Sequence, residues 1–315
     1  MKHSSRRPKG QIMIVLAVVL PALIGAMALC ADVAMFYFNW ANLQKAADAA
    51  ALAGANALPN NLSKATTDAT NYALTNGVLG GEITSITFGA ANTQITVRLS
   101  RQVPYYFARV LGLTDAPVSV LATAAINDIV RADNPIPVGL QKCSSGKPMA
   151  CYKAGDPMTL KPFDPKTKVG SGNWQLLDYG SIGGGGKDIR SGVATGCQCS
   201  VPAGGWVDTN TMTGMKVGPV QQGLQDRIDA ANASFPGETT AATASSDNPR
   251  FVTLPVVDFT GVKGKSRVPV YGFVVMFITN AKGSGDINAV FMTEVTPGEP
   301  GSTNDTLAKA PRLIQ

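Results

Sequence analysis

The segment IMIVLAVVLPALIGAMALCA, residues 12–31, contains no charged side chain. As an α-helix rising about 1.5 Å per residue it would be ~30 Å long, which matches the hydrocarbon core of a bilayer. Pro21 is compatible with such a helix, because neighbouring groups can satisfy the carbonyl that a proline frees. The segment therefore predicts a transmembrane helix.

The same segment could be the apolar part of a cleaved signal peptide, since basic residues precede it. We expect a retained anchor, because the apolar run exceeds the core of a typical signal peptide and a strongly helical sequence follows it. The flanking charges are basic before the segment (Lys2, Arg6, Arg7 and Lys9) and acidic after it (Asp32). The positive-inside rule then places residues 1–11 in the cytoplasm as a basic tip and exports the body of the chain.

The helix is predicted to continue beyond the membrane over residues 32–58. Its first turns carry the aromatic run MFYFNW, residues 35–40, at the position of an interfacial aromatic belt. Its later part, LQKAADAAALAGA at residues 43–55, is dominated by alanine, the best helix former. The candidate helix-packing residues form two adjacent ridges of small side chains: Ala46, Ala50 and Gly54, and Ala47, Ala51 and Ala55. Such ridges let another helix approach closely, and the alternative is an exposed alanine-rich stalk.

Residues 59–132 are expected to form a small α+β unit packed against the end of the long helix. Apolar periodicity predicts a helix followed by three strands, near residues 62–72, 83–88, 95–99 and 118–124. Before the last strand, Pro104 opens a predicted short helix that Gly112 closes. This short helix is expected to direct its large apolar side chains inward, namely those of Tyr106, Phe107, Val110 and Leu111.

Residues 133–137, DNPIP, indicate a domain boundary, after which Gly, Pro, Lys and Cys become more frequent. Residues 133–296 are expected to form a β-rich exported domain with one helix at 219–233. Its strands are expected at residues 158–163, 174–179, 251–259, 268–279 and 287–295. Residues 297–315 lack a periodic apolar face and are expected to be a poorly ordered tail. The predicted fold class is α+β.

Four of the five cysteines lie in the exported part of the predicted topology: Cys143, Cys151, Cys197 and Cys199. An even number in an oxidising compartment predicts two disulfides, with three possible pairings. Closure of Cys143 with Cys151 has the lowest loop entropy cost but leaves a tight Cys197–Cys199 bridge, so cross-pairing stays open. A zinc site is the competing interpretation, although these spacings are unusual for structural zinc. Cys30 is expected to be a small apolar packing residue.

Composition excludes several classes of function. Hydrophobic residues make up 45% of the chain and charged residues 15%, which favours a membrane-attached or exported protein. Four of the basic residues behind the net charge of +6 lie in the first ten positions, so the remaining chain is nearly neutral and a nucleic-acid partner is not expected. The single histidine, His3, lies in the same tip, which excludes a catalytic or metal-binding histidine in the folded body.

Three short motifs fail as catalytic or nucleotide-binding sites. GGGGK at residues 183–187 lacks the first glycine and the final Ser or Thr of a phosphate-binding loop. Ser144 and Lys147 match S-x-x-K, and residues 246–248 match S-D-N, but the K-T-G of penicillin-binding enzymes is absent. We therefore expect a non-enzymatic protein with no catalytic residue, metal or cofactor.

Several stretches resemble the N-terminal region of TadE/TadG-like proteins of the bacterial Tad (tight adherence, Flp) pilus-assembly systems. They are RRPKGQ at residues 6–11, the apolar segment, Asp32, and LQKAADAAALAGA. A second block is similar to the same family: the strand near 95–99, VPYYFARVLGL at 103–113 and VSVLATAA at 118–125. GNW at 172–174, the glycine run and GPV at 218–220 resemble the extended exported region of TadG-type proteins.

This resemblance implies a pilin-like arrangement, in which a membrane helix continues into a globular head. It implies a membrane-anchored, non-enzymatic component that assembles or anchors a Tad/Flp pilus or a related secretion machine, or serves as a minor pseudopilin. The expected partners are the bacterial inner membrane and other pilus-machinery or pilin-like proteins, bound through the N-terminal helix. The alternatives are an exported surface-binding module such as an adhesin and, less favoured, an envelope hydrolase.

Related pseudopilins are cut after a glycine such as Gly10, which here follows basic residues and precedes the apolar segment. Those substrates typically carry glutamate at the fifth position after the cut, where this chain has Val15. A carboxylate there would help to register an incoming subunit, and it would be costly in the bilayer unless paired. We therefore expect residues 1–10 to be retained and the protein to stay anchored beside the filament machinery.

Overall fold

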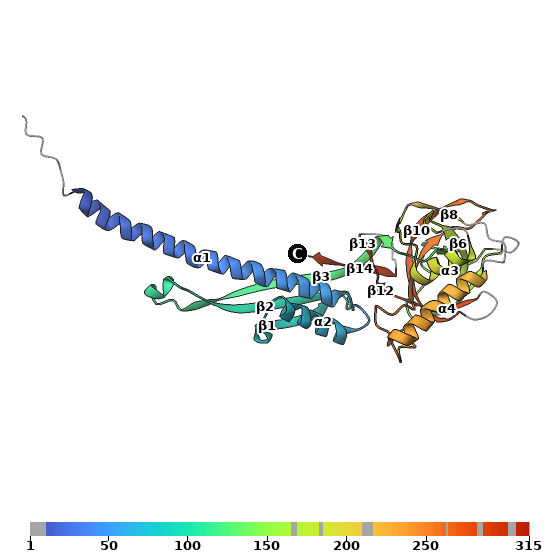
Figure 1. Cartoon of the computed structure of the whole chain (residues 1–315), viewed down its shortest axis with the longest axis horizontal. Helices are drawn as coiled ribbons and strands as arrows, with labels where there is room; N and C mark the ends of the chain where they lie inside the picture. Colours follow the sequence, from blue (N-terminus) through green and yellow to red (C-terminus); the bar gives the residue numbers. More distant parts are fainter. Residues whose placement is uncertain are drawn as a thin grey trace, which may run out of the picture.

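The computed structural model describes residues 11–164, 169–182, 185–209, 217–262, 264–281, 286–301 and 307–314. The molecule is elongated, with one long helix at one end, a helix-and-sheet unit in the middle and a β-rich domain at the other end (Figure 1). This arrangement confirms the predicted α+β class with a long apolar N-terminal helix. The four basic residues expected to set the topology lie outside the described residues.

The middle unit is a sheet with two helices packed against it. The helices are α1 (Gln11–Ala55) and α2 (Leu62–Thr75), and a turn of 3₁₀ helix, η1 (Gly80–Glu82), leads into the sheet. The strand order is β1 (Ile83–Gly89), β2 (Gln94–Pro104), β3 (Asp115–Asp133), β14 (Ala308–Ile314) and β12 (Glu294–Val295). In β2, Ile95, Val97 and Leu99 are fully buried and Arg98 is exposed, so the alternation in the sequence sets which face packs on the helices.

Strand β3 connects the two ends of the molecule. Its 19 residues span about 60 Å, far more than the predicted strand near 118–124. It pairs with β2 over its first half and with β14 in its middle. Near its end it also pairs with β13 (Gly298–Pro300) and β7 (Ser200–Pro202), which come from the C-terminal half of the chain. The middle unit and the β-rich domain therefore share one continuous strand.

The prediction of a poorly ordered tail at residues 297–315 is wrong for its described residues. β13 and β14 both lie in this stretch and both pair antiparallel with β3. Ala308 and Ala310 are buried against the sheet, and the Lys309 ammonium pairs with Asp128 of β3. The two buried apolar side chains of β14, Ala308 and Ala310, are small, so the sequence shows little periodicity. Backbone hydrogen bonds to a distant strand order the segment instead.

The C-terminal domain is built on a closed ring of strands. The ring order is β11 (Ile287–Met292), β5 (Pro157–Pro162), β6 (Asn173–Asp178), β4 (Val138–Gln141), β9 (Phe251–Val257) and β10 (Arg267–Asn280). β10 also pairs with β11, which closes the path, and β8 (Trp206–Thr209) joins β10 to β6. Among the described strands of this ring, closure leaves no long edge open to other chains. Trp174, Leu254 and Phe291 are buried in its core.

Two helices lie beside this ring. α4 (Val217–Ser234) corresponds to the helix predicted at 219–233, whereas α3 (Gly186–Thr195) was not predicted. α3 begins within the GGGGK stretch, of which residues 183 and 184 lie outside the described part. A Cβ on Gly223 of α4 would lie 2.6 Å from the carbonyl oxygen of Arg190 on α3. Because Gly223 has no side chain, α3 and α4 can lie closer together than any larger residue at position 223 would allow. This tertiary contact stabilises α3 despite its weak local sequence.

The tip of the β2–β3 hairpin differs from the prediction of an inward-facing helix. The chain forms a short 3₁₀ helix there, η2 (Ala108–Leu111), and its large apolar side chains point outward. The exposed fractions are 61% for Tyr106, 51% for Phe107, 91% for Val110 and 73% for Leu111. The two strands extend past the core of the middle unit, and the tip contacts α1 through the ring of Tyr105 and through backbone N–H groups bound by Asp32, which leaves these four side chains exposed.

Candidate functional site

The first half of α1 is an apolar surface that the described chain does not cover. Residues 13–31 are exposed apart from half-buried Ala28, and free Cys30 is exposed with them. Within the described residues, α1 is the one helix long and apolar enough to cross a membrane. An apolar surface of this size is unfavourable in water and therefore needs lipid or a partner. This half of α1 is the first element of the candidate site.

Asp32, the first charged residue after the apolar segment, holds the hairpin tip against α1. Only 4% of the residue is exposed. Its Oδ1 accepts hydrogen bonds from the backbone N–H groups of Tyr106 (2.8 Å) and Phe107 (3.2 Å), and its Oδ2 accepts from Phe107 (3.1 Å) and Ala108 (2.8 Å). The ring of Phe36, one turn further along α1, stacks on Tyr105 with centroids 4.8 Å apart. The sequence indicated Asp32 as a flanking charge and as part of the family resemblance, but not its partners, because these are backbone groups more than 70 residues away.

Replacing Asp32 by alanine is expected to release the hairpin tip. Hydrogen bonds to a charged acceptor are stronger than neutral ones, and the substitution removes all four. We expect trypsin to cleave after Arg109 about tenfold faster in the full chain in detergent micelles. Mass spectrometry of the fragments gives the rate. Asp68→Ala, which removes a surface ion pair with Lys64 on α2, is the matched control, and equal rates in the two variants would contradict the proposed clamp.

The two ridges of small residues on α1 are buried inside the same chain. Ala46, Ala47, Ala50, Ala51, Gly54 and Ala55 are all buried, in one cluster with β2, β3 and α2. A Cβ on Gly54 would lie 2.5 Å from Cδ1 of Ile95, 2.9 Å from the carbonyl oxygen of Ala65 and 3.1 Å from Cβ of Ala69. The exposed-stalk alternative is therefore wrong. The helix that approaches the ridges is α2.

A separate face of α1 remains free beyond the apolar segment. It carries Val33, Tyr37, Phe38 and Trp40, whose exposed fractions lie between 44% and 68%. The rings of Tyr37 and Trp40 stack with centroids 5.8 Å apart. Exposed aromatic side chains next to an apolar helix are typical of a membrane interface or a helix-packing surface.

The structure contains two disulfides, Cys143–Cys151 and Cys197–Cys199. The pairing within each segment is one of the three that the sequence left open. Cys143 and Cys197 are buried and partly fix the loops after β4 and α3. Both bridges belong to the C-terminal domain, which is consistent with an oxidising compartment.

Alkylation of the unreduced, denatured full chain is expected to label one thiol, that of Cys30. The other four cysteines are expected to be blocked in bridges. Intact-mass spectrometry before and after reduction counts the added labels. A Cys30→Ser variant should take up no label without reductant, and labelling of all four other cysteines with bound zinc would contradict the bridges.

The remaining polar motifs are used structurally. Ser144 and Lys147 lie in the loop closed by Cys143–Cys151, not at the start of a helix. Asn248 of the S-D-N match donates a hydrogen bond to the carboxylate of Glu238. Within the described ranges, no group of three or more His, Cys, Asp or Glu side chains is placed to hold a metal ion. The S-x-x-K match therefore lies in a disulfide-closed loop, and the S-D-N match contributes to a local hydrogen-bond network.

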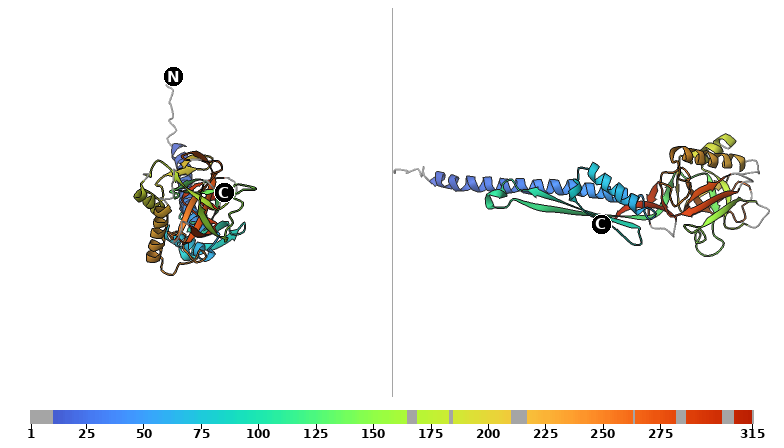
Figure 2. Two further views of the ribbon diagram at one scale, coloured as in Figure 1. Left: turned by 90° about the vertical axis from the view of Figure 1, so that its right-hand side faces the viewer. Right: turned by 90° about the horizontal axis from the view of Figure 1, so that it is seen from below.

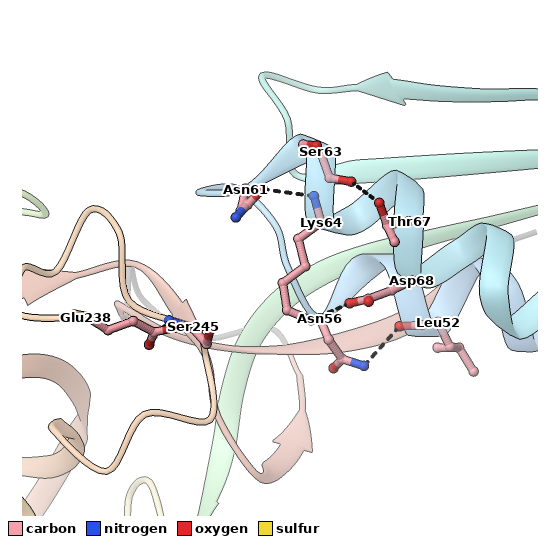
Figure 3. Close-up of polar contacts among 9 residues, drawn as sticks. All are labelled: Leu52, Asn56, Asn61, Ser63, Lys64, Thr67, Asp68, Glu238 and Ser245. Atoms are coloured by element: carbon pink, nitrogen blue, oxygen red, sulfur yellow. Dashed lines mark hydrogen bonds and ion pairs between the residues drawn. The ribbon is translucent and has the colours of Figure 1, made fainter. Parts of the chain in front are cut away.

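The middle unit meets the C-terminal half of the chain through polar contacts. The Asn60 amide donates to the carbonyl of Thr293 (2.7 Å) and to Oε2 of Glu294 (3.0 Å). Burial raises the pKa of Glu294 to about 7, and the hydrogen bond from Asn60 opposes that rise. Figure 3 shows neighbouring contacts, with Asn61 capping α2 at Lys64 and Ser245 donating to Glu238. The junction thus contains a buried carboxyl group that titrates near neutral pH.

Comparison with known proteins identifies the N-terminal element. Residues 10–57 match the family model described as "Putative Flp pilus-assembly TadE/G-like". No curated protein and no solved structure matches the chain. The matched residues include all of α1, with its uncovered apolar half, Asp32 and the buried small-residue ridges. The chain therefore carries a TadE/G-like Flp pilus-assembly domain at residues 10–57.

Proposed function

We propose that the protein is a membrane-anchored, non-enzymatic component of Tad/Flp pilus assembly or a related secretion machine. In this proposal residues 12–31 cross the bacterial inner membrane, the N-terminus is cytoplasmic and the rest of the chain is exported. The observation that carries the proposal is that the family-matched segment coincides with α1. Half of that helix lacks any cover within the described chain, and the other half forms the core of the middle unit.

Retention of the helix is favoured over its removal as a signal peptide. α1 is continuous across the end of the apolar segment, and Asp32 and Phe36 already contact the folded hairpin. Cleavage near residue 31 would leave these contacts on a frayed terminus. An intact helix instead joins the membrane segment directly to the exported unit, in the way that a pilin joins its helix to its head.

The surface proposed for other pilin-like proteins is the uncovered part of α1. The small-residue ridges are occupied by α2 and the sheet, so they do not offer a binding face. The apolar half of α1 and the face with Tyr37, Phe38 and Trp40 remain available. Packing of this helix against a neighbouring helix in the membrane would place the exported domains side by side.

A reporter that is active only in the cytoplasm is expected to be silent when fused after Gln315. A reporter active only outside the cytoplasm should be active at the same position, because residues 12–31 separate Gln315 from the cytoplasmic tip. Replacing Lys2, Arg6, Arg7 and Lys9 by glutamate should reduce correct orientation and serves as the comparison. Strong activity of the cytoplasmic reporter in the parent would reject the topology.

The assembly role is tested by purifying the full chain from its membrane. We expect pilus-machinery proteins to co-purify with it, and purification without any of them would argue against the assembly role.

A second candidate function is recognition of an external ligand by the C-terminal domain. Its supporting observation is a cleft of about 470 Å³ beside β8, where Trp206 is 58% exposed. Asp178, Asp208 and Arg267 also line it, which gives the cleft charges of both signs. Trp206→Ala would weaken capture of an extracellular ligand under this alternative and leave co-purification with pilus components unchanged.

A further inference from the structure

The tip of the β2–β3 hairpin is an exposed apolar surface beside the end of the uncovered half of α1. Its sequence, YYFARVLGLT at residues 105–114, contains one charged residue, Arg109. Val110 is 91% exposed, and Tyr106, Phe107, Leu111 and Leu113 are each more than half exposed. Loops of exported proteins are usually polar where they meet water. The composition of this tip therefore needs an apolar environment.

The position of the tip is set by its contacts with α1. The Asp32 carboxylate holds the backbone of Tyr106, Phe107 and Ala108 at the end of the apolar segment. The hairpin lies alongside α1 with its tip directed toward the N-terminal half of the helix, as the views in Figures 1 and 2 agree. The tip is therefore level with the end of residues 12–31, where the surface of a bilayer crossed by α1 would lie.

The backbone of the tip is suited to a medium poor in water. The N–H groups of Tyr106, Phe107 and Ala108 donate to Asp32. Four other backbone N–H groups of the tip donate to carbonyl oxygens of the same loop. The donors are Tyr105, Val110, Gly112 and Leu113. A backbone N–H left without a partner is costly in lipid, and an ordinary loop relies on water for such partners. This loop satisfies these donors internally.

We propose that residues 105–114 insert into the exported leaflet of the bilayer that α1 crosses, giving the protein a second membrane contact. Val110, Leu111 and Leu113 would enter the acyl region, and Tyr106 and Phe107 would lie in the interfacial belt. Arg109 would extend its guanidinium to the lipid phosphates. Two contacts, the helix and the tip, would fix the tilt and rotation of the exported unit relative to the membrane. The proposal rests on α1 being a membrane anchor.

Lipid is the occupant that this surface favours over a second protein. The tip continues the uncovered apolar surface of α1, so the medium that surrounds residues 13–31 extends directly to it. Its side chains form a small convex projection, whereas stable protein interfaces are broader and include polar contacts at the rim. A single basic residue in an apolar loop is suited to anionic lipid headgroups.

The test uses the full chain in a Cys30→Ala background, in vesicles of phosphatidylcholine and phosphatidylglycerol. The other cysteines stay in their bridges, so one environment-sensitive fluorophore can be attached at Val110→Cys. Leu79→Cys is the control outside the membrane, because Leu79 directly precedes η1 and is 70% exposed. Val19→Cys is the control within the apolar segment. Nitroxide-labelled lipids report contact with the bilayer, and iodide reports contact with water.

We expect the fluorophore at position 110 to be quenched by the labelled lipids and to be about fivefold less sensitive to iodide than the one at 79. This result should not change when the vesicles hold one protein each. Sensitivity to iodide equal to that at 79, or protection that disappears on dilution, would overturn the proposal, and the second outcome would indicate contact with another copy. Lipid quenching of the label at position 19 but not at position 110 would reject insertion of the tip and leave the membrane anchor in place. Absence of lipid quenching at position 19 would reject the membrane anchor itself.

A second variant tests the same proposal without a label. The paired substitution Val110→Gln and Leu111→Gln makes two exposed side chains polar and leaves the Asp32 contacts in place. We expect trypsin to cleave after Arg109 much faster in vesicles for this variant than for the parent, and equally fast for both once the chains are denatured. Equal rates in vesicles would contradict insertion of the tip.

Discussion

Replacing Gly54 by valine is expected to lower the free energy of unfolding by about 2–3 kcal/mol. Gly54 lies where α1, α2 and β2 meet. Its new Cβ would lie 2.5 Å from Cδ1 of Ile95 and 2.9 Å from the carbonyl oxygen of Ala65. The first contact can be relieved by a side-chain movement, but the second requires α2 to move away from α1. A urea titration of the full chain in detergent, followed by circular dichroism, measures the change.

Gly25→Val is the matched control, because Gly25 lies in the same helix and a Cβ added there would have no atom within 4 Å. We expect it to leave the urea midpoint near that of the parent. Ile95→Val should recover part of the loss when combined with Gly54→Val, since it removes the closest side-chain atom but not the backbone contact. A Gly54→Val chain as stable as Gly25→Val would show that α2 does not pack on α1 in this way.

Replacing Glu294 by glutamine is expected to stabilise the protein above pH 7 by about 3 kcal/mol and to have little effect below pH 4.5. Burial raises the pKa of Glu294 from 4.5 in the unfolded chain to about 7 in the folded protein. The folded state therefore keeps a proton that the unfolded state has already lost. As the pH rises from 4.5 to 7, the parent loses stability, and above 7 the loss is complete. Glutamine stays neutral and can still accept from Asn60.

Urea titrations of the full chain at pH 4.5, 6 and 8 measure this pH dependence. Glu299→Gln is the control, because the side chain of Glu299 on β13 is 62% exposed and makes only a surface ion pair with Arg131. The control should follow the pH profile of the parent, whereas the Glu294→Gln profile should lack the fall between pH 4.5 and 7. Parallel profiles for all three proteins would contradict a buried, protonated Glu294.

Local patterns in the sequence were sufficient for much of the fold. The uncharged run at residues 12–31 and the alanine-rich run after it predict a long helix, and α1 is continuous over both. The alternation at Ile95, Val97 and Leu99 correctly predicts the buried face of β2. The resemblance carried by the same N-terminal residues agrees with the family match at residues 10–57. Each of these features depends on side chains within a few turns or on one strand.

Other features depended on segments that are distant in the sequence. The ordering of β14 needs β3, and the direction of Tyr106 and Val110 depends on how far the hairpin extends past the core. The sequence also did not decide which surface covers the ridge with Gly54 or which groups bind to Asp32. A small residue can pack against several kinds of surface, and a carboxylate can accept hydrogen bonds from several kinds of donor.

The sequence by itself determined that this protein has an apolar helix and an α+β body, and it predicted two disulfides among four cysteines. Only the tertiary structure decided that the ridges are buried within the chain, that Asp32 ties the hairpin to the helix, and that an apolar tip is left exposed at the end of the apolar segment. The physical reason is that periodicity in the sequence shows which side chains avoid water, but not which segment or which medium covers them. Backbone hydrogen bonds and close packing between distant segments make that choice.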